Sequence, residues 1–300
     1  MADFPPRLTL SSGVLTAELL PEWGGKMISL RTEPDGYDFL APAPFGPHVP
    51  DPTLFAPEDA YGWDEMFPGC LPESYPAGPW GEARVADHGD LWHRAWTVDE
   101  VHAAGRAARL SVGDERLGWR FAKVLHFSDP LTLVIDYRVE NRGRFSLPWL
   151  YYAHIICPYH AGIELELPAG RYERLETYGR PLPELCRGDE PALRRQEAFP
   201  ERSAAFYVGD DLGAAGCLRY RDGPARKSMA LRWTGALANL GLWYNKGGWT
   251  DEKPLTHLGL EPATAPCPGL AEWAARGGSR PLEPGQSVSW TLTAHIETFG

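Results

Sequence analysis

The sequence is poor in cysteine and in positive charge, and each shortage excludes a class of protein. None of its cysteines belongs to a CxxC pair, and the five are scattered: Cys70, Cys157, Cys186, Cys217 and Cys267. An odd number of scattered thiols favours neither a disulfide framework nor a zinc site, so we expect reduced cysteines in a cytoplasmic protein. Lysine and arginine number 29 against 40 acidic residues, and the net charge of −11 argues against nucleic acid and anionic membranes as partners.

Long apolar segments are also missing. The richest stretch, LPWLYYAHIICPY at residues 147–159, is shorter than the roughly 18 residues that span a bilayer, and it carries polar side chains. The N-terminal residues MADFPPRLTLSS lack a basic segment followed by an apolar one. We therefore expect neither a secretory signal nor a membrane-spanning helix.

The motifs of several common enzyme classes are absent as well. The chain has no GxGxxG or GxxxxGK(S/T) phosphate loop, no HExxH metal helix and no GxSxG nucleophile elbow. His88 and His93 have a spacing that two metal ligands can share, but no second cluster supplies the remaining ligands. We therefore expect neither a metal site nor a cofactor.

Short segments of alternating polarity dominate the rest of the chain. In LTLVIDYRVE at 131–140 and VSWTLTAHIE at 288–297, apolar residues occupy nearly every second position. This period of two predicts strands with one buried face. Further strands are predicted at 7–10, 14–19, 27–31, 94–101, 107–112, 119–127, 148–156, 163–167, 204–208, 216–220, 228–233, 238–244 and 256–260. One short helix is predicted at 269–276, where Gly277 and Gly278 follow.

Turn residues separate these segments along the whole chain. The sequence has 32 glycines and 29 prolines, with no fixed-period repeat and no polar linker. Residues 179–202, rich in proline and charge, are predicted to form a long surface loop. Many short strands joined by turns favour antiparallel sheets packed face to face. We therefore predict one all-β domain over residues 1–300, a large antiparallel β-sandwich with few short helices.

Polar residues among aromatic ones are the candidates for function. Asp64 and Glu65 in YGWDEMFPGC (61–70) form either a solvated turn or a carboxylate group at a pocket rim. His88, followed by glycine and then by tryptophans, suits a hydrogen-bonding group in an aromatic cleft. His154, which shares one face of a predicted strand with Tyr152, is either a core histidine or a functional one.

Glu261 in HLGLEPATAP (257–266) is the fourth candidate. Leu258 and Leu260 alternate with it, so Glu261 points away from the layer in which the leucines pack. Pro262 favours an extended backbone at Glu261, which lets the strand continue to it. A solvated glutamate is the alternative. The twelve tryptophans and twelve tyrosines fit either a large core or a sugar-binding surface.

Taken in order, these segments resemble the aldose 1-epimerase (galactose mutarotase-like) family over roughly residues 8–297. The resemblance is carried by LPEWGGKMISL (20–30), DHGDLW (87–92), LPWLYYAH (147–154), LGLWYNKGGW (240–249), HLGLEPATAPCPGLAEW (257–273) and LEPGQSVSWTLTAHI (282–296). It implies the galactose mutarotase-like supersandwich fold. It also implies the interconversion of the α and β anomers of an aldose by acid and base catalysis, without a metal or redox cofactor.

Residue roles follow from the same resemblance. It places the catalytic histidine at His154 and the catalytic glutamate at Glu261, and we expect Glu261 to act as the base and His154 as the acid. It implies further contacts with the sugar from His88, Asp64, Tyr152, Trp243 and Asn245. The expected partner is a small sugar, and the chain is expected to be a monomer or a homodimer.

Two features depart from the family pattern. Members that act on hexose 6-phosphates read His-Gly-Phe-Ala-Arg, whereas this chain reads HGDLW at 88–92, with Arg94 the nearest arginine. An unphosphorylated aldose is therefore predicted. The family's additional carboxylate has no clear match, and Asp210 and Asp211 are the candidates for it.

Two other functions remain open on the residues alone. A carbohydrate-binding or regulatory protein would use the same aromatic cleft without depending on His154 and Glu261. A glycoside hydrolase or lyase would pair Glu261 with another carboxylate such as Asp64.

Overall fold

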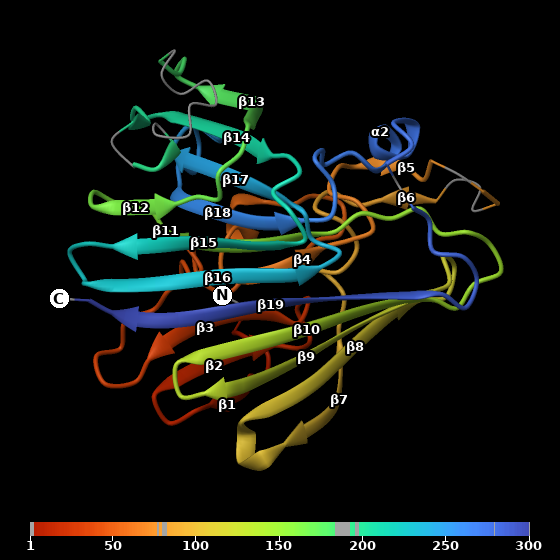
Figure 1. Cartoon of the computed structure of the whole chain (residues 1–300), viewed down its shortest axis with the longest axis horizontal. Helices are drawn as coiled ribbons and strands as arrows, with labels where there is room; N and C mark the ends of the chain where they lie inside the picture. Colours follow the sequence, from red (N-terminus) through yellow and green to blue (C-terminus); the bar gives the residue numbers. More distant parts are fainter. Residues whose placement is uncertain are drawn as a thin grey trace.

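Two large antiparallel sheets make up most of the computed structural model, which describes residues 3–76, 78–79, 83–183, 193–195, 198–278 and 280–299 (Figure 1). The first sheet has nine strands in the order β1-β2-β3-β4-β11-β18-β17-β14-β13. Its strands are β1 (Leu8–Ser11), β2 (Leu15–Leu20), β3 (Lys26–Thr32), β4 (Trp63–Met66), β11 (Tyr152–Pro158), β18 (Thr256–Ala263), β17 (Asn239–Lys246), β14 (Ser203–Gly209) and β13 (Tyr172–Gly179).

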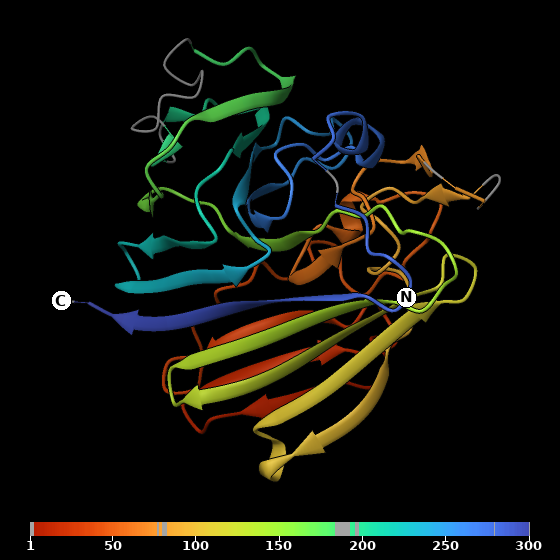
Figure 2. The ribbon, with the colours of Figure 1, turned by 45° about the vertical axis from the view of Figure 1, so that its right-hand side comes forward.

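The second sheet has eight strands in the order β12-β15-β16-β19-β10-β9-β8-β7. They are β12 (Ile163–Glu166), β15 (Ala215–Asp222), β16 (Lys227–Gly235), β19 (Ser287–Thr298), β10 (Thr132–Asn141), β9 (Trp119–Asp129), β8 (Ala107–Asp114) and β7 (Thr97–His102). In Figure 2 the red strands β1–β3 of the first sheet lie behind β8–β10 of the second.

The remaining described elements are small. They are the two-stranded pair β5 (Glu73–Ser74) and β6 (Arg84–Val85), the helix α2 (Leu270–Ala275) and the 3₁₀ turns η1 (Pro57–Asp59) and η2 (Ala103–Gly105). The carboxylate of Glu73 accepts hydrogen bonds from the backbone N–H groups of Leu270 and Ala271, which fixes the start of α2 beside β5 (Figure 1). No helix in the described ranges is long and apolar enough to cross a membrane.

The predicted all-β class and antiparallel sheets are confirmed, and the alternating pattern explains why. On β10 the apolar residues Leu133, Ile135 and Val139 are at most 1% exposed, whereas Asp136 and Arg138 between them face solvent. The same alternation recurs on β19, which pairs with β10 over nine residue pairs from Thr132 to Glu140. Matching buried faces therefore fix the register of the central strands.

Several local predictions differ from the structure. The strand predicted at 148–156 begins only at Tyr152, because the preceding N–H groups of Leu150 and Tyr151 bond to Pro68 and to the Thr264 side chain. Strands β4, β5, β6 and β13 were not predicted. Within the predicted loop 179–202, residues 184–192 and 196–197, including Cys186, lie outside the described residues.

The solvated-turn interpretation of Asp64 and Glu65 is wrong, because both lie on β4 and are at most 1% exposed. Glu65 points between the two sheets. Both of its carboxylate oxygens lie 2.9–3.0 Å from Nζ of Lys123 on β9, and the hydroxyl of Tyr137 on β10 donates to it at 3.1 Å. Lys123 also donates to the carbonyl of Gly25 at 2.8 Å. This polar cluster joins the two sheets inside an apolar layer.

Replacing Lys123 by Met should destabilise the protein by about 3–5 kcal/mol, because it leaves the Glu65 carboxylate buried without its cation. The double variant Lys123→Met/Glu65→Gln should recover most of that loss, since no buried charge then remains unpaired. Urea denaturation of the wild type and of the two variants measures the free energies of unfolding. A single Lys123→Met variant as stable as the wild type would contradict this account.

Candidate active site

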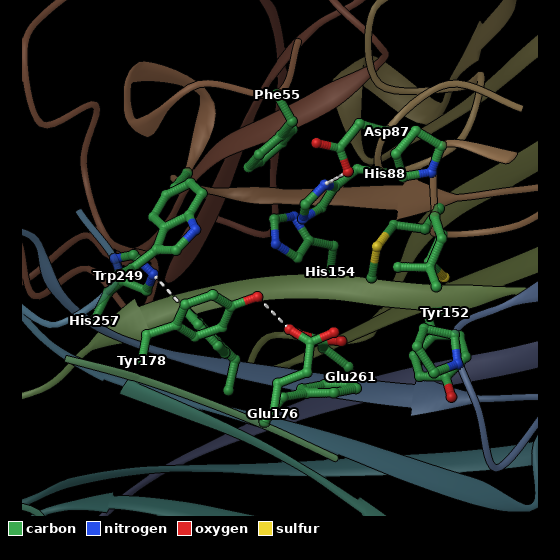
Figure 3. Close-up of a pocket in the computed structure, with 18 residues that line it drawn as sticks. Phe55, Asp87, His88, Tyr152, His154, Glu176, Tyr178, Trp249, His257 and Glu261 are labelled. Carbon is green, nitrogen blue, oxygen red and sulfur yellow. Dashed lines mark hydrogen bonds and ion pairs between the residues drawn. The ribbon is translucent and has the colours of Figure 1, made fainter. Parts of the chain in front are cut away.

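A cavity of about 300 Å³ lies over the nine-stranded sheet (Figure 3). His154, which lines it, is paired with Asp64, so the cavity is on the face of the sheet opposite to that of Glu65 and Lys123. Its aromatic lining residues are Phe55, Tyr152, Tyr178, Phe206, Trp243 and Trp249. Its acidic and histidine lining residues are Asp87, His88, His154, Glu176, His257 and Glu261. The Cys70 thiol also lines it. None of the described lining residues is a lysine or arginine. Of the seven predicted site residues, five line this cavity, whereas Asp64 and Asn245 do not.

His154 lies on β11 directly opposite Asp64 on β4, and its side chain is almost fully buried. Its Nδ1 is 2.7 Å from Oδ1 of Asp64. Because a carboxylate can only accept, Nδ1 carries a hydrogen and Nε2 remains for a ligand. The Phe55 ring and the imidazole form a T-shaped pair, with ring centroids 5.5 Å apart. Burial lowers the pKa of His154 below its ordinary value, although the Asp64 charge opposes this effect.

Asp64 is a support for His154, which corrects its predicted place at the pocket rim. Its second oxygen is 2.9 Å from Nζ of Lys26 on β3, and that lysine also donates to the carbonyl of Asp59 at 2.7 Å. Burial alone would raise the pKa of Asp64, but the Lys26 and His154 charges outweigh it and hold this pKa well below its usual range. Asp64 therefore stays ionised behind the imidazole.

Glu261 lies on β18 and points into the cavity, while Leu258 and Leu260 are fully buried in the core. Two glycines make room for its carboxylate. A Cβ at Gly241, opposite Glu261 on β17, would lie 3.0 Å from Oε2, and a Cβ at Gly259 would lie 2.8 Å from Oε1. The carboxylate thus occupies space that any larger residue at these two positions would take.

The surroundings of Glu261 favour its protonated form. Burial raises the pKa of Glu261 to about 8, and the nearby charges of Asp64 and Glu176 add to this effect. At neutral pH the proton is therefore held by Glu261, and the His154 imidazole is neutral. Figure 3 shows His88 and His154 along the top of the cavity, with the carboxylates of Glu176 and Glu261 below them.

His88 enters the cavity from a tight turn in the left-handed region, with φ of 59°, followed by Gly89 with φ of 78°. A Cβ at Gly89 would lie 2.6 Å from the backbone N of Phe67, so only glycine fits there. The Nδ1 atom of His88 is 2.9 Å from the Asp87 carboxylate, and Phe55 stacks on the ring at a centroid distance of 3.7 Å. These contacts fix the orientation of the imidazole.

Asn245 has a structural place that differs from its predicted contact with the sugar. It is fully buried, and its Oδ1 accepts hydrogen bonds from the N–H groups of Gly247, Gly248 and Trp249 at 3.0–3.4 Å. Asn245 therefore shapes the turn that carries Trp249 to the cavity. Tyr152 lines the cavity, and its hydroxyl donates to the carbonyl of Ala265 at 2.7 Å.

Other candidates from the sequence lie elsewhere. Asp210 and Asp211 do not line the cavity, and the additional carboxylates there are Asp87 and Glu176. Arg94 is paired with Asp114 at 2.6 Å and is not a lining residue. Within the described ranges, no group of three or more His, Cys, Asp and Glu side chains is arranged to hold a metal ion.

Several residues that line the cavity have no clear pattern in the sequence around them. Phe55 lies in an irregular segment, and Glu176 and Tyr178 lie on the unpredicted strand β13. His257 is the exception, because the alternation that directed Glu261 toward the cavity placed His257 on the same side of β18.

No family model matches the sequence, and no curated protein sequence matches it. Solved structures match it over nearly its whole length. The Slr1438 protein of Synechocystis sp. PCC 6803 has a TM-score of 0.72 at 18% identity, with 99% of this chain and 97% of that chain covered. A candidate aldose 1-epimerase of Escherichia coli K12 has a TM-score of 0.71 at 15% identity, covering 98% and 99%.

A galactose mutarotase-like protein of Clostridium acetobutylicum has a TM-score of 0.64 at 16% identity, covering 97% of this chain and 95% of that chain. At such identities the likeness shows the fold alone. The chain therefore has the fold of the aldose 1-epimerase and galactose mutarotase-like structures, as its sequence predicted.

Proposed function

We propose that the protein is an aldose 1-epimerase that interconverts the α and β anomers of an unphosphorylated aldose. The observation that carries this proposal is the placement of Glu261 and His154 in one cavity, where burial moves their pKa values in opposite directions. A carboxyl group with a raised pKa and an imidazole with a lowered one together hold a single mobile proton near neutral pH. Cavity size and aromatic walls suit one sugar ring.

Mutarotation requires a proton to be added to the ring oxygen while another leaves the anomeric hydroxyl. In the resting state described above, Glu261 protonates the ring oxygen and Nε2 of His154 takes the hydroxyl proton, so that the bond from C1 to the ring oxygen breaks. The open-chain aldehyde rotates about C1–C2. On closure His154 returns its proton to the carbonyl oxygen, and Glu261 regains its own from the attacking hydroxyl.

This order reverses the roles expected from the resemblance, in which Glu261 is the base and His154 the acid. Those roles require the proton to start on the imidazole, whereas burial favours it on Glu261. The two assignments use the same two groups. Because ring closure is the reverse of ring opening, each group acts as the acid in one step and as the base in the other. The ionised Asp64 behind His154 stabilises the imidazolium that forms during the step.

The lining residues support a neutral aldose over a sugar phosphate, because they include three carboxylic acids and no described lysine or arginine. A glycoside hydrolase that pairs Glu261 with Asp64 is less well supported. Both oxygens of Asp64 are engaged by His154 and Lys26, and Asp64 is not a lining residue.

Glu261→Gln should lower kcat/KM for mutarotation by about 10²–10⁴-fold, because one proton-transfer group is lost. The wild-type profile of kcat/KM against pH should be bell-shaped, rising through a pKa below 6.5 and falling near pH 8. Polarimetry on a panel of aldoses measures both. The matched control is Glu176→Gln, the same change in the same cavity, which should stay within tenfold of the wild type.

A folded Glu261→Gln protein with wild-type rates would refute the proposed pair. If calorimetry shows that the wild type binds a sugar but polarimetry shows no rate above that of buffer, the chain is a carbohydrate-binding protein instead.

The raised pKa of Glu261 also has a consequence for stability. Its pKa is about 8 in the folded chain and near 4.5 when unfolded, so the folded state binds more protons between these values. Folding stability should therefore fall as the pH rises from about 4.5 to 8. Glu261→Gln lacks this loss, so its stability relative to the wild type should increase over that range and level off above it. Urea denaturation from pH 5 to 9 tests this, and parallel curves would show that Glu261 has an ordinary pKa.

A further inference from the structure

A second buried imidazole, His257, lines the same cavity and has no part in the proton transfers proposed above. It lies on β18 four residues before Glu261, on the same side of the strand, and only 4% of it is exposed. In Figure 3 it lies beside Trp249, at the end of the cavity away from Tyr152.

The contact with Trp243 on β17 shows which ring nitrogen of His257 carries the hydrogen. The indole Nε1 of Trp243 is 3.0 Å from Nε2 of His257. An indole N–H can only donate, so Nε2 must be the acceptor and must be unprotonated. The hydrogen of the neutral ring is therefore on Nδ1. Burial lowers the pKa of His257 to about 3, with a smaller contribution from His154, which agrees with a ring that stays neutral.

The Nδ1–H group has no hydrogen-bond acceptor among the described residues, because the indole contact is the one bond that His257 makes there. Nδ1 is not among the described side-chain atoms that are sealed from solvent without a partner, so this donor stays accessible in the cavity and a ligand that offers no acceptor there would leave it unpaired. His154 differs in this respect, since its own Nδ1 is satisfied by Asp64. The two imidazoles thus present opposite groups to the cavity, a basic Nε2 from His154 and an N–H donor from His257.

We propose that His257 is a specificity-determining residue, a fixed neutral donor that binds one hydroxyl oxygen of the sugar through Nδ1–H. This inference rests on the proposed function in that the ligand is a sugar, but it does not require mutarotation. Because Nε2 is occupied by the indole and a neutral imidazole does not release its remaining hydrogen near neutral pH, His257 binds and orients without transferring a proton. The hydroxyl that it contacts is one that takes no part in ring opening.

The state of the ring can be tested without any sugar. In protein labelled with ¹⁵N-histidine, the chemical shifts of His257 should report a neutral ring with hydrogen on Nδ1 throughout pH 5–8. His257→Gln identifies its signals by their loss. A ring that titrates near pH 6.5, or one that carries hydrogen on Nε2, would overturn the proposal.

The ligand contact can be tested with monodeoxy analogues of an accepted aldose, each of which lacks one hydroxyl. In the wild type, the analogue that lacks the contacted hydroxyl should bind about 5–30-fold more weakly by calorimetry, since it leaves the donor unpaired. In His257→Phe this one penalty should fall to about twofold or less, while the penalties at other positions remain. His257→Gln, which keeps an N–H donor, should retain more of it.

The kinetic readouts separate this role from catalysis. His257→Phe should raise KM, change kcat by less than about threefold and leave the apparent pKa values of the pH profile unchanged. Glu261→Gln, in contrast, should lower kcat. Deoxy penalties that are unchanged or uniformly reduced in His257→Phe, or a loss of kcat alone, would overturn the assignment of His257. If the wild type binds sugar without catalysing mutarotation, the position-specific loss in His257→Phe still supports the contact.

Discussion

The burial of two adjacent carboxylates on β4 is the constraint on which both the sandwich and the cavity depend. Side chains alternate along a strand, so Asp64 and Glu65 point to opposite faces of the same sheet. Glu65 meets Lys123 from the second sheet, and Asp64 meets Lys26 and His154 within its own. The pair of Glu65 with Lys123 holds the two sheets together, and the contacts of Asp64 with Lys26 and His154 position the imidazole. Packing and site geometry are therefore set by a strand of four residues.

Burial of polar side chains determines the properties of the rest of the cavity. His154 and Glu261 are both almost fully buried, and this burial moves the proton of the pair toward the carboxyl group. The glycines at 241 and 259 contribute by leaving space for the carboxylate, and Phe55 contributes by covering the histidines. The polar groups are thus held in fixed directions by apolar surroundings, which is the condition under which small changes in position alter pKa values strongly.

The sequence predicted the fold and part of the site because alternation is a local signal. Two-residue periodicity located β10 and β19, and it gave the direction of Glu261. It failed where burial of charge is decided by distant partners: nothing near Asp64 or Glu65 indicates that Lys26 and Lys123 will neutralise them. Asn245 shows a second limit, since a side chain that caps backbone N–H groups and one that binds a sugar have the same residue type. The edge strand β13 mixes charged and apolar residues without a regular period, so Glu176 and Tyr178 could not be placed.

The position of β13 at the edge of the nine-stranded sheet separates two tasks within one cavity. His154 and Glu261, which transfer protons in the proposed function, stand on the central strands β11 and β18, each hydrogen-bonded on both sides. Glu176 and Tyr178 stand on β13, which has a neighbour on one side among the described strands. A change in the shape or charge of the edge wall therefore disturbs few backbone partners. Under the proposed function, substitutions on β13 can therefore change which sugar is preferred while His154 and Glu261 keep their positions, so that a new substrate can be accepted without a change in the proton-transfer groups.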